Sequence, residues 1–300
     1  IPAFNSAAWI EEAIRSVLVQ SLPPHEIIVV DDGSTDGTSA RVAAFGNRVR
    51  YIRQDNLGVA AARNRGIAVA EGELIAFLDA DDVWHPRKLA IQRTALLADP
   101  TLDMLGTETF AWPGGAPDVH EAGTVNMVTW PQLAVRNRFT TSSVMVKRAA
   151  LRGEAPFDEH LRGPEDLDLW LRLAEVGRVG LLDAPLVGYR TVEASLGQRP
   201  ASMEQGLQRI LNKLDARDAW GPRALLRRRA MSHARYSCAY MYHATGRYRE
   251  ALQRLWSSFV LYPLPYRADE VRMPLARVRM LARVVLGWLL HRAPRQEAAP

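Results

Sequence analysis

Two short, largely apolar runs that end in clusters of acidic residues constrain most strongly what this chain can fold into. The first run is Glu26 to Val30, followed by Asp31-Asp32-Gly33, and the second is Leu74 to Leu78, followed by Asp79-Ala80-Asp81-Asp82. Runs of this length are typical of strands buried on both faces. Amphipathic helical patterns separate them, so the chain is predicted to form βα units around a mostly parallel sheet.

Composition and charge divide the chain into two parts. Of its 300 residues, 48% are hydrophobic and 24% charged, which excludes a disordered or fibrous chain. From residue 201 onward there are 18 Lys and Arg against 7 Asp and Glu, so this part carries about +11 and residues 1–200 about −6. We therefore predict an α/β domain over residues 1–200 and an all-α, basic extension over residues 201–300.

Cysteine usage and the chain start indicate the compartment. Cys238 is the single cysteine, which excludes an internal disulfide and indicates a reducing, cytoplasmic environment. No apolar segment reaches the roughly 18–20 residues of a membrane-spanning helix, and because polar residues such as Asn5 and Glu11 occur near the start, we expect no signal peptide. Ile1 to Asn5 resembles the end of a buried strand, so we expect the natural N-terminus to lie upstream.

Polar and acidic side chains follow three of the predicted strands. Asn5, Asp31-Asp32 and Asp79 to Asp82 stand at strand ends, and the carboxyl ends of parallel strands form one edge of the sheet, where ligands bind. Gathered carboxylates repel one another unless a cation joins them, and such hard oxygen ligands favour Mg²⁺ or Mn²⁺ together with phosphate oxygens. Helix capping explains Asp36 well, but it explains two acids one residue apart, Asp79 and Asp81, poorly.

Five sequence blocks occur in the order in which a known enzyme family carries them. They span about residues 1–195 and are Ile1 to Asn5, Glu26 to Asp36, Gly58 to Asn64, Gly72 to Asp82 and Glu165 to Leu173. Together they resemble the family-two inverting glycosyltransferases, which use nucleotide-diphospho-sugars. The resemblance implies the GT-A fold, a Rossmann-like domain in which helices flank a mostly parallel, mixed sheet.

The resemblance also implies a donor site and a metal site. Asp79-Ala80-Asp81 is similar to the family's Asp-X-Asp element, which implies that Asp81 ligates Mg²⁺ or Mn²⁺ and that Asp79 shares the metal or contacts the ribose. Asp32 matches the residue that reads the nucleobase, and Arg63 matches a block where it would offset phosphate charge. The other residues implied to bind the nucleotide sugar are Pro2, Ala3, Phe4, Asn5, Gly33, Ser34, Gly58 and Ala80.

The resemblance implies a catalytic base at the start of a helix. Asp166 matches the acid of the family's Glu-Asp pair, with Glu165 as the second candidate; the plain alternative is a helix-terminal charge. Because a helix N-terminus favours negative charge, we expect a lowered pKa that keeps Asp166 ionised. His85, directly after the acidic cluster, is a minor candidate for a third metal ligand, and Trp170 is expected in the core rather than in a sugar site.

The basic extension carries two further patterns. Residues from about 233 to 263 have spacings similar to one tetratricopeptide repeat, which is a helical hairpin. Arg272 to Arg292 alternates Arg with apolar residues, a combination that suits a helix lying on an anionic membrane surface. No aromatic–basic interleaving or known motif supports nucleic-acid binding.

The sequence thus predicts an inverting glycosyltransferase that moves a sugar from a UDP- or dTDP-type donor to a polysaccharide or lipid-linked glycan. It would act in the cytoplasm or at the inner face of the cell membrane. A nucleotidyltransferase is the enzymatic alternative, but it would carry a Gly-rich loop after the first strand, and Asn5 to Ala8 is not one. A catalytically inactive scaffold is the other alternative, and the joint presence of Asp32, Asp79, Asp81 and Asp166 argues against it.

Overall fold

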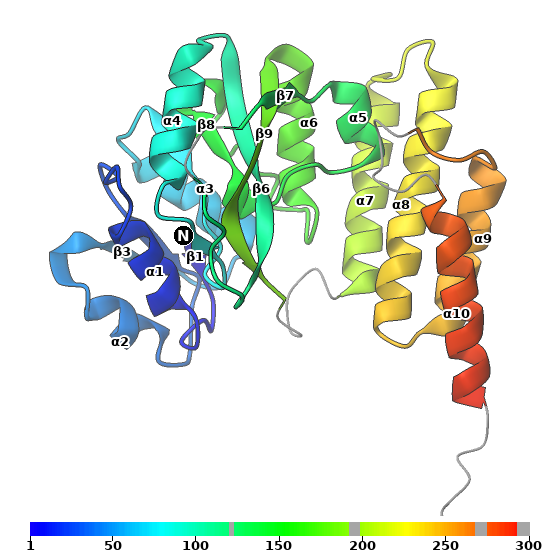
Figure 1. Cartoon of the computed structure of the whole chain (residues 1–300), viewed down its shortest axis with the longest axis horizontal. Coiled ribbons are helices and arrows are strands. Elements are labelled where there is room, and N and C mark those ends of the chain that lie inside the picture. Colours follow the sequence, from blue (N-terminus) through cyan, green and yellow to red (C-terminus); the bar gives the residue numbers. More distant parts are fainter. Residues whose placement is uncertain (120–122, 192–198, 268–274, 293–300) are drawn as a thin grey trace, which may run out of the picture. The chain divides into compact units, whose positions relative to one another are not determined.

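A computed structural model describes residues 1–119, 123–191, 199–267 and 275–292. The chain divides into two compact units (Figure 1): Ile1–Leu133 with Asn137–Glu193, and Ala134–Arg136 with Ala194–Pro300. Each unit is described by itself below.

The first unit begins with a small parallel sheet in the order β1-β2-β3. Its strands are β1 (Pro2–Ala3), β2 (Ile28–Asp31) and β3 (Arg50–Arg53). Three helices alternate with these strands along the chain: α1 (Ile10–Leu18), α2 (Thr38–Ala43) and α3 (Val59–Val69). The parallel register Ala3↔Asp31 aligns the ends of β1 and β2 at one edge of the sheet.

A second, mixed sheet follows in the order β4-β8-β6-β9-β5, with β7 beside β9. Its strands are β4 (Leu74–Ala76), β5 (Val83–Trp84), β6 (Leu102–Trp112), β7 (Val125–Met127), β8 (Met145–Lys147) and β9 (Arg178–Arg190). Its helices are α4 (Lys88–Ala98), α5 (Trp130–Val135) and α6 (Glu165–Val176). The predicted α/β class with a C-terminal helical region is confirmed. Among the described residues of this second sheet, β6 and β9 pair in parallel, and the sheet's other pairings are antiparallel.

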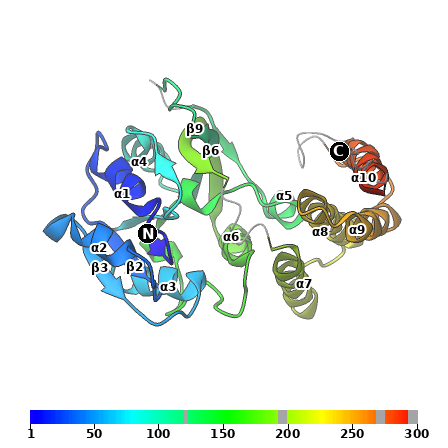
Figure 2. The same cartoon turned by 90° about the horizontal axis from the view of Figure 1, so that it is seen from below.

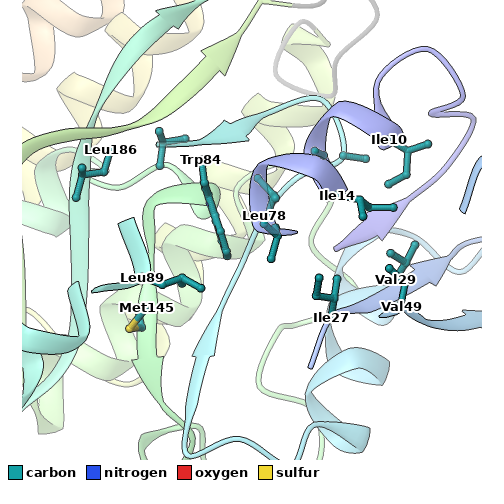
Figure 3. Close-up of a cluster of buried hydrophobic side chains, with 14 of the residues drawn as sticks. Ile10, Ile14, Ile27, Val29, Val49, Leu78, Trp84, Leu89, Met145 and Leu186 are labelled. Carbon is teal, nitrogen blue, oxygen red and sulfur yellow. The ribbon is translucent and has the colours of Figure 1, made fainter. Parts of the chain in front are cut away.

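One apolar cluster joins both sheets. Ile10 and Ile14 of α1 have no exposed surface and face Val29 of β2 (Figure 3), and Leu78 and Trp84 extend the same cluster toward the second sheet. Burying an aliphatic side chain of this size contributes about 1.5–3 kcal/mol. Because side chains from both sheets are buried in this one apolar cluster, the two sheets form a single domain.

Three aromatic side chains pack together between α6 and the end of β4. Trp170 of α6 is fully buried, as the sequence predicts, and its ring meets that of Phe157 at 76° and 6.1 Å. Phe77, directly after β4, meets the ring of Phe157 edge-on at 5.4 Å. The three rings fix the start of α6 against the segment that leads into the acidic cluster.

The second unit is helical, with α7 (Pro200–Ala216), α8 (Ala224–Ala244), α9 (Tyr248–Leu261) and α10 (Ala276–Arg292). Figure 2 shows α8, α9 and α10 almost end on, so the three helices lie side by side with nearly parallel axes. Gly246, with φ at 73°, makes the turn between α8 and α9, a conformation that favours glycine. Fully buried Ala239 and Ala251 let these two helices approach closely, and Cys238 is buried in the same cluster.

None of the helices in the described ranges is both long and apolar enough to cross a membrane.

Candidate active site

The end of β2 supplies two acidic side chains with different roles. Asp31 is completely buried, and its carboxylate accepts hydrogen bonds from the Ser34 amide (2.7 Å) and the Tyr51 hydroxyl (2.5 Å). Burial opposes its ionisation, but these bonds and the charge of Arg53 together hold the pKa of Asp31 below its usual range. Asp31 is therefore a structural anion that shapes the turn.

Asp32 organises the loop that precedes α3. Its Oδ1 accepts hydrogen bonds from the Gln54 side-chain amide at 2.8 Å and the Leu57 amide at 2.9 Å, and its Oδ2 accepts one from the Gly58 amide at 2.8 Å. Gly58 has φ at 100°, which L-residues rarely adopt. Both carboxylate oxygens of Asp32 are thus engaged by the protein, and contact with a nucleobase stays a prediction.

The ends of β1 and β2 meet through hydrogen bonds between residues predicted to bind the donor. The Asn5 amide donates to Ser34 Oγ at 2.9 Å, and Asn5 Oδ1 accepts from the Thr35 amide at 2.9 Å. Gly33 has φ at 82°, and a Cβ there would lie 3.0 Å from the Asn56 amide nitrogen, so a side chain would be strained. Phe4 is 49% exposed at this edge. The sheet therefore gathers these residues at one edge, with Phe4 and Asn5 exposed and Ser34 buried.

The acidic cluster after β4 is tied to two other segments. Ser142 Oγ accepts a hydrogen bond from the Asp79 amide at 3.0 Å and donates one to Asp82 Oδ2 at 2.6 Å. The Arg190 amide, at the end of β9, donates to Asp82 Oδ1 at 3.0 Å. Burial and then the charge of Asp79 raise the pKa of Asp82 to about 7. Asp82 is therefore a structural acid that fixes the loop.

Asp81 has the environment expected of a metal ligand. Among the described residues, no other side chain makes a hydrogen bond or ion pair with its carboxylate; the Arg190 Nε bonds only its backbone oxygen, at 3.0 Å. Burial, followed by the charge of Asp79, raises the pKa of Asp81 to about 6. A partly buried carboxylate that has no ion-pair partner among the described residues fits a hard divalent ion.

The remaining predicted ligands of a metal are less available. Asp79 is ion-paired with Arg63, and the buried imidazole of His85 accepts a hydrogen bond from the Arg87 amide at Nδ1. In the described part of the chain, no three His, Cys, Asp or Glu side chains form a metal-binding group. The donor set therefore fits an ion completed by ligand oxygens or water rather than an all-protein cage.

Arg63 joins the acidic cluster to the start of α6. Its Nη2 donates to Asp79 Oδ1 and its Nη1 to Glu165 Oε1, each at 2.7 Å, although 102 residues separate Arg63 from Glu165. The guanidinium is 5.4 Å from the centre of the Phe157 ring. The sequence predicted that Arg63 offsets phosphate charge; in the structure its partners are two carboxylates.

Asp166, the predicted base, is the second residue of α6. Its Oδ1 accepts a hydrogen bond from the Leu167 amide at 2.7 Å, and its Oδ2 accepts one from the Asn137 side chain at 3.0 Å. The expectation that the helix dipole lowers its pKa is wrong. Burial and then the charge of Glu165 raise the pKa of Asp166 to about 7, against the opposing effects of Arg63 and the two hydrogen bonds.

Three residues of this region were missed by sequence reasoning. Asn137 contacts Asp166, and Ser142 joins Asp79 to Asp82. The Tyr189 ring is 45% exposed, and burial of its hydroxyl together with the charges of Asp82, Asp81, Asp79 and Asp166 raises its pKa. Tyr189 is thus close to both the acidic cluster and the predicted base. None of the three lies in a motif, and only the folded chain brings them here.

Comparison with known proteins shows what the first part of the chain is similar to. Residues 1–127 match the family model described as glycosyl transferase family 2. A relative from Rickettsia felis, named an uncharacterized glycosyltransferase, is 33% identical over 193 residues, which are 63% of this chain and 32% of the relative. The chondroitin synthase of Pasteurella multocida is 31% identical over 188 residues, 59% of this chain and 19% of that protein. The chain therefore spans about a third or less of the length of these relatives.

Solved structures share the fold. The S. aureus TarS fragment 1–349 in complex with UDP-GlcNAc superposes with a TM-score of 0.61 at 20% identity, covering 96% of this chain and 87% of that one. The mannosyltransferase PcManGT from Pyrobaculum calidifontis, in complex with GDP-Man and Mn²⁺, gives a TM-score of 0.57 at 20% identity, covering 96% of this chain and 84% of that one. At this identity the similarity shows the fold alone.

Proposed function

We propose, from the match of residues 1–127 to the glycosyl transferase family 2 model, that the chain is an inverting glycosyltransferase. It moves a sugar from a nucleotide-diphospho-sugar to a hydroxyl of a polysaccharide or lipid-linked glycan. The observation that carries the proposal is Asp166: a carboxylate whose pKa lies near 7, next to a cluster of carboxylates after β4. A general base works best when its pKa is close to the working pH.

The donor site consists of the ends of β1 and β2 together with the acidic cluster. Phe4 and Asn5 are exposed there and are available for direct contact, while Asp32 and Ser34 hold the surrounding backbone. The set proposed to bind a UDP- or dTDP-type donor is Pro2, Ala3, Phe4, Asn5, Asp32, Gly33, Ser34, Gly58, Asp79 and Ala80. The UDP-GlcNAc and GDP-Man in the two similar structures support a nucleotide-sugar donor.

Asp81, with Asp79 beside it, would hold the Mg²⁺ or Mn²⁺. When bound, the ion stabilises the negative charge that develops on the leaving diphosphate. The unpaired carboxylate of Asp81 and the Mn²⁺ in the PcManGT structure support this assignment.

Asp166 is the better proton acceptor of the two acids, because its hydrogen bonds come from neutral amides whereas Glu165 is ion-paired with Arg63. Glu165 is 4% exposed, and its two oxygens accept hydrogen bonds from Arg63 Nη1 and from the Gly163 amide. Asp166 takes the proton of the acceptor hydroxyl while the acceptor oxygen bonds to the anomeric carbon. The bond between that carbon and the diphosphate oxygen breaks, and its electron pair leaves with the diphosphate, so the configuration inverts.

The test compares Asp166→Asn with Asp183→Asn, an acid at an exposed position of β9. A screen of nucleotide sugars by donor hydrolysis first identifies the donor. We expect Asp166→Asn to reduce turnover by about 10²–10⁴-fold and to leave UDP binding in the presence of Mn²⁺ unchanged, while Asp183→Asn keeps full activity. Unchanged turnover of Asp166→Asn would remove Asp166 as the base.

The same measurements separate the alternative functions. A nucleotidyltransferase would release pyrophosphate from a nucleoside triphosphate and a sugar phosphate, and an inactive scaffold would bind no nucleotide at all. UDP binding that requires Mn²⁺, together with hydrolysis of a nucleotide sugar, is the result expected here.

A peripheral contact with an anionic membrane, at the cytoplasmic face, forms part of the proposal. Between Leu275 and Arg292 the chain has no acidic residue, and α10 exposes a mixed apolar and basic surface: Val278, Leu281, Val285 and Leu286 with Arg279 and Arg283. Apolar and basic side chains on one helix suit an anionic lipid surface. Residues 272–274 of the predicted segment lie outside the described residues.

Vesicle sedimentation tests the membrane contact. The protein should bind phosphatidylcholine vesicles that contain phosphatidylglycerol, bind pure phosphatidylcholine more weakly, and be released by salt. Leu281→Ser with Val285→Ser should reduce binding, whereas Val19→Ser, a change at an exposed apolar residue after α1, should not. Equal binding to both kinds of vesicle, or none, would contradict the proposal.

A further inference from the structure

We propose that Arg63 is a positioning residue: its guanidinium locks Asp79 and Glu165 into one ion-paired unit, and its charge keeps the neighbouring Asp166 able to accept a proton near neutral pH. The proposal rests on the proposed role of Asp166 as the base. It gives Arg63 a function through two carboxylates of the protein rather than through the phosphates of the donor.

The geometry leaves Arg63 little freedom for another partner. The residue is 6% exposed, and its two terminal nitrogens each donate to a different carboxylate at 2.7 Å. The remaining guanidinium nitrogen, Nε, is buried and has no hydrogen-bond partner among the described residues. Because the guanidinium is planar and rigid, two such bonds fix the separation between Asp79 and Glu165.

Both ends of this unit carry the chemistry proposed above. Asp79 belongs to the acidic cluster, and Glu165 directly precedes Asp166. Glu165 is buried, so without Arg63 it would be a charge in the interior with one backbone hydrogen bond. Removing one partner of a buried ion pair leaves the other charge uncompensated. Arg63 therefore holds Glu165 in place beside Asp166 and balances its charge.

The charges that face Asp166 come from three elements. Glu165 of α6 disfavours its ionisation, Arg63 of α3 favours it, and Tyr189 of β9 is electrostatically coupled to it. The Asn137 amide is a neutral donor to the same carboxylate. Arg63 thus opposes the charge of Glu165 at Asp166, and its loss should raise the pH at which Asp166 ionises.

The experiment follows the carboxyl ¹³C signal of Asp166 by NMR as a function of pH, in protein without donor or metal. The signal is assigned by its disappearance in Asp166→Asn. We expect a midpoint near pH 7 for the unmodified chain, and a rise of about one pH unit or more in Arg63→Met. Glu165→Gln should lower the midpoint, and Arg63→Lys should stay close to the original value. Arg65→Met removes an exposed arginine two residues along α3 and should change nothing.

Opposite shifts in Arg63→Met and Glu165→Gln are the result that supports the proposal. An unchanged midpoint in folded Arg63→Met would overturn it. If Arg63→Met does not fold, the Glu165→Gln variant tests the proposal instead. A lowered midpoint of Asp166 in that variant supports opposing effects of Glu165 and Arg63 on Asp166, and an unchanged midpoint refutes them. The acid limb of donor hydrolysis, measured with UDP-GlcNAc or the donor found by screening, should move with the NMR midpoint. A shifted NMR signal with an unshifted acid limb would instead count against Asp166 as the base.

Discussion

Lys88 offers a prediction about stability whose size can be worked out from the structure. The residue begins α4 with no exposed surface, and its Nζ donates to Gln92 Oε1 at 2.6 Å and lies 4.3 Å from the centre of the Trp84 ring. No carboxylate of the described chain pairs with it. Burial alone lowers the pKa of Lys88 from 10.5 to about 7. We predict that Lys88→Met, which keeps the length of the side chain and removes the amine, stabilises the protein at neutral pH.

The magnitude follows from linkage between protonation and folding. Between pH 7 and 10.5 the unfolded chain holds the Lys88 proton and the folded chain does not, so stability rises with pH across this window. At 1.36 kcal/mol per pKa unit, the deficit at pH 7 is about 5 kcal/mol. The substitution removes this deficit but leaves Gln92 Oε1 without a donor, which costs about 1–3 kcal/mol. The net gain at pH 7 is therefore about 2–4 kcal/mol.

Equilibrium urea unfolding at several pH values between 6 and 10.5 checks this reasoning. The stability difference between Lys88→Met and the unmodified chain should be positive at pH 6 and 7 and should shrink as the pH rises. It should change sign between about pH 8 and 10, where the remaining deficit has fallen to the cost of about 1–3 kcal/mol for leaving Gln92 Oε1 without a donor. Lys147→Met alters an exposed lysine and should show no such dependence. A difference that does not vary with pH would refute the reasoning, as would a less stable variant at pH 7.

Four further outcomes are expected. The kcat/KM for transfer should fall below pH about 7 as Asp166 becomes protonated, which a pH–rate profile would show. Asn137→Ala should lower kcat and move that acid limb to higher pH, because it removes a hydrogen bond to the ionised carboxylate; an unmoved limb would contradict it. Gly106→Ala should destabilise the first unit by about 1–3 kcal/mol in urea unfolding, since the new Cβ would lie 2.3 Å from Phe139. Ala251→Leu should separate α8 from α9 and reduce helicity and resistance to proteolysis, because Ala251 has no exposed surface.

Local pattern was sufficient to predict the acidic edge of the sheet. A short apolar run predicts a strand, and the acids that follow it are predicted to lie at the end of that strand. Asp31, Asp32 and Asp79 were located from the sequence in this way. The same kind of pattern located Trp170 in the core and the helical hairpin of α8 and α9. These features depend on neighbours within a few residues.

Features that depend on packing could not be predicted in this way. The Arg63–Glu165 ion pair joins residues 102 positions apart, and nothing in either segment specifies the other. The direction of the Asp166 pKa shift was wrong because the helix N-terminus is a local feature, while burial by surrounding segments is not. β8 likewise pairs antiparallel with β4 and with β6. An apolar run predicts a strand but neither its direction nor its neighbours in the sheet, so these pairings could not be predicted.

The charges at the site explain why several of its carboxylates resist ionisation. Arg63 forms ion pairs with Asp79 and Glu165, while the Arg190 guanidinium forms its ion pair with Glu12. Burial, followed by the charge of a neighbouring carboxylate, raises the pKa of Asp81, Asp82 and Asp166, so negative charge is in excess at this partly buried site. A diphosphate brought to the same edge would add to the excess. A divalent cation would reverse it, so the binding of a nucleotide-diphospho-sugar to this protein should require one.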